Sequence, residues 1–354
     1  MARDGLPTLR IAVVGTGLIG GSVLRRLAQT EHEVVGWDPD PGTRTTGTDL
    51  GLSFADRLDD ALAGRDVVFL CGPLSSLPTG LAEVVAAAPE HCVITDVGST
   101  KMAVAEAAER AGLTDRFVGG HPMAGSERAG LAAATADLYV GAPWVLTPLG
   151  VPGLPAFRLL ARLVLESFDA RVVPLDATVH DDIVALASHI PHLLAGALAT
   201  ATDRSDVRAA VLSLAAGSFS DGTRVAGTPS ARTTDMLLNN RAAIARRIGL
   251  VRAALDDLVD AVVTGDAERL LSCLSEGRHA RLDLLARHTE PASREFNSGL
   301  DSGFGSGFGS GFGSGKDDEE LAYLVELGAS GGCVTGCRVD GDRVTYTVLR
   351  PATP

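Results

Sequence analysis

The first half of the chain alternates short apolar runs with alanine-rich amphipathic stretches. The runs have the length of buried strands, and the stretches between them have helical spacing. Strands that alternate with helices predict βαβ units and a parallel sheet covered on both faces. We therefore expect an α/β domain over residues 1–174. Its predicted strands are 9–14, 33–37, 66–71, 92–96, 116–119 and 143–147, and its clearest helices are 22–27, 77–88 and 102–111.

From residue 175 the pattern changes to helical periodicity alone. No strand is expected between 175 and 316, so residues 175–296 are predicted to form an all-α second domain. Apolar positions recur on several faces of these helices, which is more than one small layer can bury. We therefore expect a homodimer formed by helix packing. The predicted helices are 179–201, 208–218, 231–258 and 267–287.

The last part of the chain combines a glycine-rich segment with a short tail. Residues 297–316 include three SGFG units, and glycine at every second position favours a flexible linker. The alternative is an aromatic segment that docks Phe304, Phe308 or Phe312 on a partner. The tail, residues 317–354, is predicted to form a helix and a hairpin.

The hairpin of the tail is expected to turn at Asp340-Gly341, a pair typical of a type I′ turn. The tail is too short for a core of its own, so we expect it to pack on the body or to lie loosely. On this interpretation, removal of residues 302–354 should leave the catalytic site intact.

Composition narrows the class of protein. The chain has 354 residues, which suggests two domains, and a net charge of −13, which argues against nucleic acid or an anionic membrane as partner. We find no 18-residue apolar run and no signal-peptide pattern, and five cysteines are too few for a disulfide framework. A cytoplasmic protein with a small-molecule substrate is expected.

A glycine motif follows the first predicted strand directly and opens a helix. Its spacing, G-x-G-x-x-G, is typical of the turn that binds a dinucleotide pyrophosphate in a Rossmann-type, doubly wound sheet. Asp38 ends the next strand, where a carboxylate accepts bonds from ribose hydroxyls and repels a 2′-phosphate. The cofactor is therefore predicted to be NAD. Two alternatives stay open, since Arg44 lies nearby and complicates the choice of cofactor, and a glycine turn can form without binding a nucleotide. The candidate cofactor residues are Gly15, Thr16, Gly17, Leu18, Ile19, Gly20, Asp38, Gly72, Pro73 and Ser99.

Two further segments leave adjacent strands at the carboxyl edge, where open α/β sheets bind ligands. One contains Ser99 and the other contains His121. We expect the two side chains to meet beside the nicotinamide, where a neutral imidazole is a suitable general base. A structural histidine in a turn is the alternative.

The helical domain offers a second set of polar candidates. Pro191 should kink its helix and free the carbonyl of Ala187, and the histidines beside it, His189 and His192, suggest the lining of a cleft. Satisfied histidines in a kinked core helix are the alternative. A metal site is disfavoured, because carboxylates and a third ligand at zinc spacing are missing.

A glycine-rich helix break over 216–224 ends in Arg224. A guanidinium there suits a carboxylate, which it can bind with two parallel hydrogen bonds. The alternative is an ordinary surface connection between helices.

Taken together, six ordered motifs resemble the prephenate/arogenate dehydrogenase family, over about residues 9–290. This resemblance implies a Rossmann domain with a helical dimerisation domain, and NAD-dependent oxidative decarboxylation of prephenate to 4-hydroxyphenylpyruvate. Arogenate or 4-amino-4-deoxyprephenate is the alternative substrate. A more distant alternative is a different function, that of a non-catalytic nucleotide-binding interaction protein. The motifs are GTGLIGGS (15–22), DVGSTK (96–101), GGHPMAGSERAG (119–130), GAPWVLTP (141–148), HDDIVALASHIPH (180–192) and AAGSFSDGTR (215–224).

The resemblance also implies roles for single residues. His121 matches the histidine that takes the proton of the C4 hydroxyl, and Ser99 matches the serine that hydrogen-bonds this hydroxyl. Arg224 matches the arginine that holds a substrate carboxylate. Two departures favour the amino analogues, since many relatives have a basic residue at Ser220 and a tryptophan near Thr233. The other substrate-pocket candidates are Ser188, His189, His192, Gly217 and Asp221.

Overall fold

The structure is a computed structural model that describes residues 5–126, 128–298 and 315–352. It divides into two compact units. The sheet unit comprises the described residues up to His180 and from Thr289 onward, and the helical unit comprises Asp181–His288.

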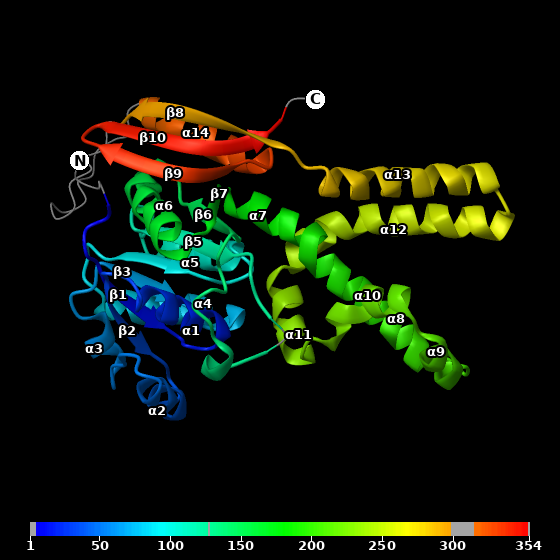
Figure 1. Ribbon diagram of the computed structural model, residues 1–354, viewed down its shortest axis with the longest axis horizontal. Helices are drawn as coiled ribbons and strands as arrows, with labels where there is room; N and C mark the ends of the chain where they lie inside the picture. Colours follow the sequence, from blue (N-terminus) through cyan, green and yellow to red (C-terminus); the bar gives the residue numbers. More distant parts are fainter. Residues whose placement is uncertain (1–4, 127, 299–314, 353–354) are drawn as a thin grey trace. The chain divides into compact units, whose positions relative to one another are not determined.

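The sheet unit is built on one sheet, in the order β2-β1-β3-β4-β5-β6-β7-β9-β10-β8 (Figure 1). The strands from β2 to β5 are parallel, and β6 is antiparallel to β5. The strand β7 is parallel to β6, and the last three strands are antiparallel. The strands are β1 (Arg10–Val14), β2 (Glu33–Trp37), β3 (Val67–Leu70), β4 (Val93–Asp96), β5 (Phe117–Pro122), β6 (Pro143–Pro148), β7 (Arg171–Pro174), β8 (Thr289–Asn297), β9 (Cys333–Asp340) and β10 (Arg343–Pro351).

Helices cover both faces of this sheet, as the α/β pattern predicts. One apolar core joins side chains of the sheet with α1, α6 and α14, and a second joins the sheet with α4 and α5. Strands buried on both faces have near-continuous apolar sequences, which is why most of them could be located from the sequence. The helices are α1 (Leu18–Leu27), α2 (Pro41–Asp49), α3 (Leu58–Leu62), α4 (Leu77–Ala87), α5 (Met102–Arg110), α6 (Leu154–Phe168), α7 (Ala177–Val184) and α14 (Gly315–Ala329).

The prediction that no strand lies between 175 and 316 is wrong, because β8 occupies Thr289–Asn297. This strand pairs along its whole length with β10 and lies at the edge of the sheet. Most of its side chains are exposed, and Phe296 is its one buried residue. An edge strand of this kind carries little of the apolar alternation by which strands are recognised.

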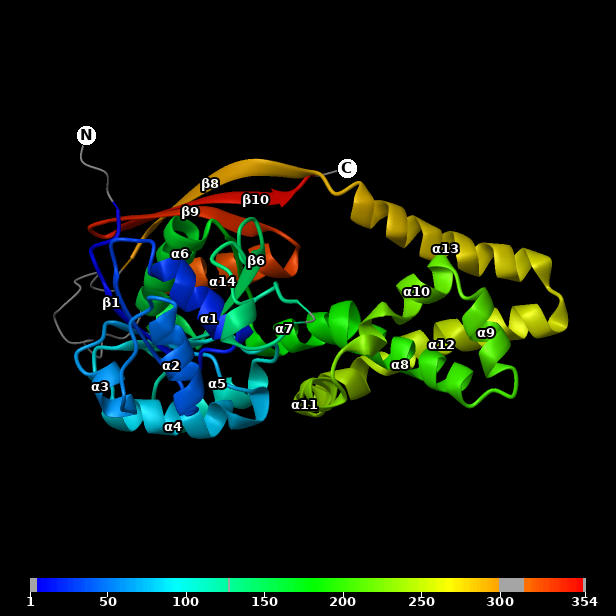
Figure 2. The same cartoon turned by 60° about the horizontal axis from the view of Figure 1, so that its bottom comes forward.

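The tail of the chain completes the sheet rather than lying loosely. The strands β9 and β10 form the expected hairpin (Figure 2). The strand β9 also pairs with β7, at Val334 and Val172. The turn differs from the prediction. Its two loop residues are Gly341 and Asp342, and only Gly341 has a positive φ, of 55°, whereas a type I′ turn needs both.

A buried polar network also joins the tail to the sheet unit. Arg158 of α6 is 3% exposed and donates through Nε to Glu320 Oε1 of α14 at 2.9 Å. It donates through Nη1 to Ser298 Oγ at 3.0 Å, and the Tyr346 hydroxyl donates to Glu320 Oε1 at 2.7 Å. Most of the predicted linker 297–316, including its three phenylalanines, lies outside the described residues.

The helical unit is all-α, as predicted, although two predicted helices are divided. The predicted helix 208–218 ends at Leu214, and the predicted helix 231–258 is interrupted at Asn240. Antiparallel α12 and α13 pack side by side (Figure 1). The helices are α8 (Ile190–Asp203), α9 (Arg208–Leu214), α10 (Gly217–Thr223), α11 (Ser230–Asn239), α12 (Arg241–Thr264) and α13 (Ala267–Leu285), with a π-helical turn at Ala185–His189 and a 3₁₀ turn, η5, at Arg224–Gly227.

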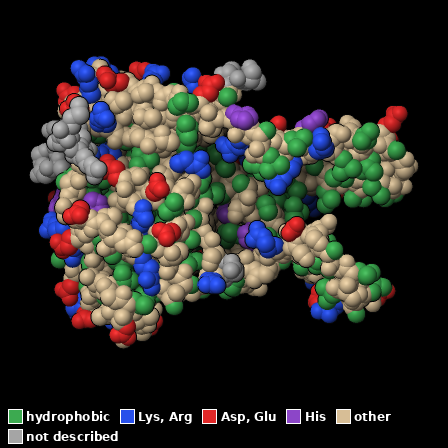
Figure 3. All heavy atoms as spheres, viewed as in Figure 1, with side chains coloured by type: hydrophobic (Ala, Val, Ile, Leu, Met, Phe, Trp, Pro, Cys, Tyr) green, Lys and Arg blue, Asp and Glu red, His purple; other side chains and the backbone are tan. Residues whose placement is uncertain are grey.

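Large apolar side chains remain exposed on the helical unit. Leu214, Val263 and Leu285 are 82%, 79% and 68% exposed, and hydrophobic side chains gather over the end of the α12–α13 pair (Figure 3). Exposed apolar area on this scale is typical of a surface that a protein partner covers.

The expectation of no long apolar run is wrong for one segment. The continuous helix Ala177–Asp203 contains an 18-residue window with a mean hydropathy of 1.5, of which 28% is buried. Length and composition would allow this helix to cross a membrane. One such helix is weak evidence, because a helix that packs against protein passes the same test.

Candidate functional site

The glycine turn joins β1 to α1 in a conformation that only glycine permits. Gly15 has a φ of 89°, and a Cβ placed on it would lie 2.9 Å from the carbonyl oxygen of Cys71. A Cβ on Gly20 would lie 1.9 Å from the carbonyl oxygen of Gly15. At Gly17, in contrast, no other atom of the described part of the chain lies within 4 Å of the Cβ position. The turn is therefore closely packed behind Gly15 and Gly20 and open in front of Gly17.

The N-terminus of α1 begins at this open side. Gly17 is its N-cap, and no side chain of the described residues caps the first backbone N–H groups of the helix. These groups and the helix dipole together favour an anion. The arrangement fits the pyrophosphate of a dinucleotide.

Asp38 does more than the sequence suggested. Its Oδ2 accepts from the backbone N–H of Thr16 at 2.7 Å and from the Thr16 hydroxyl at 3.2 Å, and its Oδ1 accepts from Asp40 N–H at 3.0 Å. The carboxylate thus holds the glycine turn against the end of β2. A carboxylate has about four acceptor positions, so one remains for a ribose hydroxyl.

Two other residues near this loop were singled out in the sequence. Arg44 donates through Nη1 to the backbone carbonyl of Asp38 at 2.7 Å. Gly72 and Pro73 follow β3 beside the turn, and a Cβ on Gly15 would lie 3.2 Å from Gly72 N.

Ser99 follows β4, and His121 lies in the neighbouring parallel strand β5. Ser99 lies in the turn after β4, is half-buried, and its hydroxyl has no hydrogen-bond partner within the described ranges. His121 is also half-buried, but it belongs to β5 itself rather than to a loop. The strand is longer than predicted because β6 pairs with it as far as Pro122 and Trp144.

The ring of His121 is hydrogen-bonded to a second histidine. His121 Nδ1 lies 2.8 Å from Nε2 of His180, with the rings edge to face and their centroids 5.1 Å apart. His180 lies on α7 and is 1% exposed. Sequence reasoning noted His180 only as the start of a motif and missed this contact, for which the pattern gave no signal beyond the residue type.

The helix around Pro191 bends through the π-helical turn Ala185–His189. Proline at position 191 cannot donate its backbone bond, and a π turn is a common way to absorb that loss. His192 Nδ1 lies 2.9 Å from the carbonyl oxygen of Ser188, so the imidazole is a hydrogen-bond partner for a backbone carbonyl of the π-helical turn. Ser188 and His192 are both half-buried.

His189 lies inside the helical packing. It is 1% exposed, and the Asn240 amide donates to its Nδ1 at 2.8 Å and to the carbonyl of Asp181 at 2.9 Å. The structure therefore gives His189 a buried protein partner.

Gly217, Asp221 and Arg224 follow one another along α10 and the start of η5, and all three are exposed. Both segments pack against α8, which carries His192. Arg224 makes no ion pair within the described part of the chain. Its guanidinium thus keeps its donors for an anion. Ser99 and His121 belong to the sheet unit, whereas these candidates belong to the helical unit.

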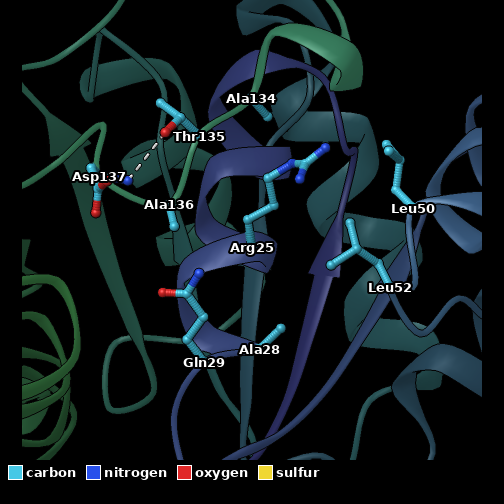
Figure 4. A pocket seen from close by; sticks show the side chains of 9 residues that line it. All are labelled: Arg25, Ala28, Gln29, Leu50, Leu52, Ala134, Thr135, Ala136 and Asp137. Carbon is cyan, nitrogen blue, oxygen red and sulfur yellow. Dashed lines mark hydrogen bonds between the residues drawn. The ribbon is translucent and has the colours of Figure 1, made fainter.

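Two hollows stand out on the surface of the described residues. One of about 440 Å³ lies beside α1 and is lined by Arg25, Leu50, Leu52 and their neighbours, and none of the candidate residues lines it (Figure 4). The other, of about 510 Å³, lies in the helical unit, where His192 and Thr233 are among its lining residues. Across the described ranges, no group of three or more His, Cys, Asp or Glu side chains could hold a metal ion.

The sheet unit combines a glycine turn that fits a dinucleotide with a hydrogen-bonded histidine, and a helical unit follows it in the chain. These features are typical of a nucleotide-dependent oxidoreductase. Two family models match the chain. The prephenate dehydrogenase nucleotide-binding domain matches residues 21–174, and the prephenate dehydrogenase dimerization domain matches residues 176–276. The chain belongs to the prephenate dehydrogenase family.

Individual relatives agree with this assignment. The chain is 34% identical over 269 residues to prephenate dehydrogenase of Bacillus subtilis, covering 73% of this chain and 72% of the relative. It is 30% identical over 284 residues to cyclohexadienyl dehydrogenase of Zymomonas mobilis, covering 78% and 97%.

Solved structures are similar over the same share of the chain. Prephenate dehydrogenase from Aquifex aeolicus, in complex with hydroxyphenyl propionate and NAD⁺, has a TM-score of 0.73 and 26% identity, covering 79% of this chain and 99% of that one. Synechocystis arogenate dehydrogenase has a TM-score of 0.70 and 29% identity, covering 78% and 100%.

Proposed function

We propose that the protein oxidatively decarboxylates prephenate to 4-hydroxyphenylpyruvate with NAD as cofactor, a step of tyrosine biosynthesis. The observation that carries this proposal is the His121–His180 hydrogen bond in the unit that also holds the glycine turn. Membership of the prephenate dehydrogenase family supports the reaction class, and one similar solved structure contains NAD⁺.

NAD fits the nucleotide turn and, when bound, supplies the hydride acceptor. The first N–H groups of α1, which no described side chain caps, would hold the pyrophosphate. The remaining acceptor position of Asp38 binds a ribose hydroxyl, and its negative charge disfavours a 2′-phosphate.

In this mechanism His121 accepts the proton of the substrate C4 hydroxyl while hydride leaves C4. His180 holds His121 through Nδ1 and so orients the ring that takes the proton. The unpartnered hydroxyl of Ser99 hydrogen-bonds the same substrate oxygen. Loss of CO₂ then follows because it makes the ring aromatic, so the enzyme needs orientation and a proton acceptor. A positioned base contributes about 10²–10⁴-fold in rate.

The substrate is a dianion and the protein has a net charge of −13, so binding needs a local positive group. Arg224 supplies it for one substrate carboxylate, with His192 and Ser188 as further contacts and Gly217 and Asp221 shaping the pocket. We assign His189 a positioning role, because it is buried against Asn240.

The first test is the rate of NADH formation by the purified protein with prephenate, arogenate and 4-amino-4-deoxyprephenate in parallel. We expect the highest kcat/KM with prephenate. No turnover of prephenate together with turnover of arogenate would transfer the assignment to the alternative substrate, and no turnover of any of the three would refute the enzymatic function.

One observation favours the amino analogues as the second candidate. Thr233 lines the hollow in the helical unit, and its buried hydroxyl has no hydrogen-bond partner among the described residues. An amino group of the substrate could pair with such a hydroxyl, whereas a bulky residue at this position would fill the space.

Cofactor choice provides a second prediction. Asp38→Ser should relax the preference for NAD, because it removes both the charge and a ribose acceptor. Hydrogen bonds to charged groups are worth roughly 1.5–3 kcal/mol, so the ratio of kcat/KM for NAD to that for NADP should fall by about 10–100-fold. Asp38→Asn is the matched control, since it removes the charge but keeps an acceptor for Thr16. An unchanged ratio in both variants would mean that other groups select the cofactor.

We further propose a homodimer formed through the helical unit, which matches a dimerization-domain model and exposes the apolar side chains noted above. The proposed place of action is the cytoplasm, with a small-molecule substrate and with neither nucleic acid nor membrane as partner. The net charge of −13 supports the absence of a polyanion partner.

A further inference from the structure

We propose that the buried ion pair between Asp96 and Lys101 is a positioning device that fixes Ser99 relative to His121. This inference rests on the proposed function, since it concerns the residues assigned to proton transfer. All four residues belong to the sheet unit.

The ion pair supplies hydrogen-bond partners to β5 where its pairing with β4 has ended. Parallel pairing between β4 and β5 ends at Thr95 and Val118, whereas β5 continues to Pro122. Beyond that point, the β5 backbone needs other partners on its β4 side, because buried N–H and C=O groups are rarely left unpaired. Lys101 Nζ donates to the carbonyl of Gly120 at 2.6 Å, and Asp96 Oδ1 accepts from Gly120 N–H at 3.1 Å. Both backbone groups of the residue before His121 are thus held by the ion pair.

The same pair also holds the turn that carries Ser99. Asp96 Oδ2 accepts from Gly98 N–H at 2.7 Å and from Lys101 Nζ. Ser99 lies between Gly98 and Lys101, so the hydrogen bonds fix the chain on both of its sides. One ion pair therefore connects the serine turn directly to the histidine strand.

Three glycines allow this close approach. A Cβ on Gly119 would lie 3.1 Å from Lys101 Cδ, and a Cβ on Gly120 would lie 2.4 Å from the carbonyl oxygen of Asp96. A Cβ on Gly98 would lie 2.9 Å from Asp96 Oδ2. Side chains at these places would push the ion pair away from the backbone that it holds.

Stability alone does not explain a pair of this kind. The side chains of Asp96 and Lys101 are both 0% exposed, and moving two charges out of water costs about as much as their attraction returns. Replacing such a pair by apolar residues of similar size often leaves the stability of a protein unchanged. What they could not do is hold an N–H and a C=O of β5 at once. A displacement of about 1 Å at a reacting group can reduce the rate by about 10²-fold.

The test uses the full chain and separates rate from binding. Lys101→Met should lower kcat by about 10²-fold, while KM for the substrate changes by less than about threefold, because the residues proposed to hold the substrate carboxylate belong to the helical unit. NADH affinity, measured by fluorescence titration, should match that of the wild type. The double variant Asp96→Asn/Lys101→Met removes both charges, so it should keep a wild-type melting temperature and still show the low kcat.

Lys316→Met is the matched control, since Lys316 is the other lysine of the chain and is exposed on α14. Its kcat should equal that of the wild type. If Lys101→Met does not fold, the double variant decides the question. Wild-type kcat in a folded Lys101→Met or double variant would overturn the positioning role, as would a rise in KM without a fall in kcat. Wild-type protein that turns over none of the three cyclohexadienyl substrates would instead refute the proposed function.

Discussion

His121→Asn is expected to reduce kcat by about 10²–10⁴-fold, because asparagine is close in shape to the imidazole but cannot accept the proton of the substrate hydroxyl. NAD affinity should stay close to that of the wild type, since the glycine turn and Asp38 are built from other strands. Steady-state NADH formation gives kcat, and a fluorescence titration gives the cofactor dissociation constant.

The matched control for this substitution is His91→Asn. The His91 side chain is 49% exposed and lies near Asp66 on the surface of the sheet unit. We expect wild-type kinetics for this variant. Normal kcat in folded His121→Asn would place the base at another residue.

The second large effect concerns stability. Glu320→Ala should destabilise the protein by about 3–5 kcal/mol, because it leaves the buried guanidinium of Arg158 without its main partner. Burial alone would lower the pKa of Arg158, but the hydrogen bond and charge of Glu320 outweigh it and raise that pKa, so Arg158 stays charged. At roughly 2–4 °C for each kcal/mol in a unit of this size, the melting temperature should fall by about 6–20 °C.

A neighbouring residue offers the comparison for this prediction. Glu319 pairs with Arg294, and its side chain is 61% exposed, so Glu319→Ala should cost less than about 1 kcal/mol. The double variant Arg158→Met/Glu320→Leu should recover part of the stability, because neither charge of this pair is then buried alone, although buried Asp317 loses its ion pair with Arg158. Equal melting temperatures for Glu320→Ala and Glu319→Ala would contradict the importance of the network.

The same contacts revise an expectation from the sequence. Removal of residues 302–354 would delete Glu320 together with β9 and β10, and it would leave β7 and Phe296 of β8 uncovered. We now expect this truncation to destabilise the sheet unit, rather than to leave the catalytic site intact.

Elements with a strong local pattern could be predicted from the sequence. The strand β2 has the predicted bounds, and the glycine turn opens α1 as expected. The helix α2 was missed because PGTRTTGTD has no apolar face, and its start depends on Asp40, whose side chain accepts from Gly42 and Thr43 N–H groups. The strand β8 was missed because its own residues lack an apolar alternation. It is a strand because it pairs with β10, which follows it in the chain by more than 40 residues.

The candidate site shows the same division. Residue types and spacing identified Gly15, Gly20, Ser99 and His121 as candidates, because a strand end and a turn are local features. They could not reveal the contact of His121 with His180, which is 59 residues away in the chain. Nor could they show that Asp38 fastens the glycine turn, since that bond depends on how β1 and β2 pair.

Because β8, β9 and β10 follow His288, the helical unit is an insertion within the sequence of the sheet unit. A ribosome therefore makes all the helices of that insertion before the last three strands exist. Until they emerge, the outer edge of β7 lacks its partner, and an open edge is a site for wrong pairing between nascent chains. A premature stop codon between Asn297 and β9 thus leaves the edge of β7 open, and so affects a part of the molecule made before the helical unit as well as the end of the chain.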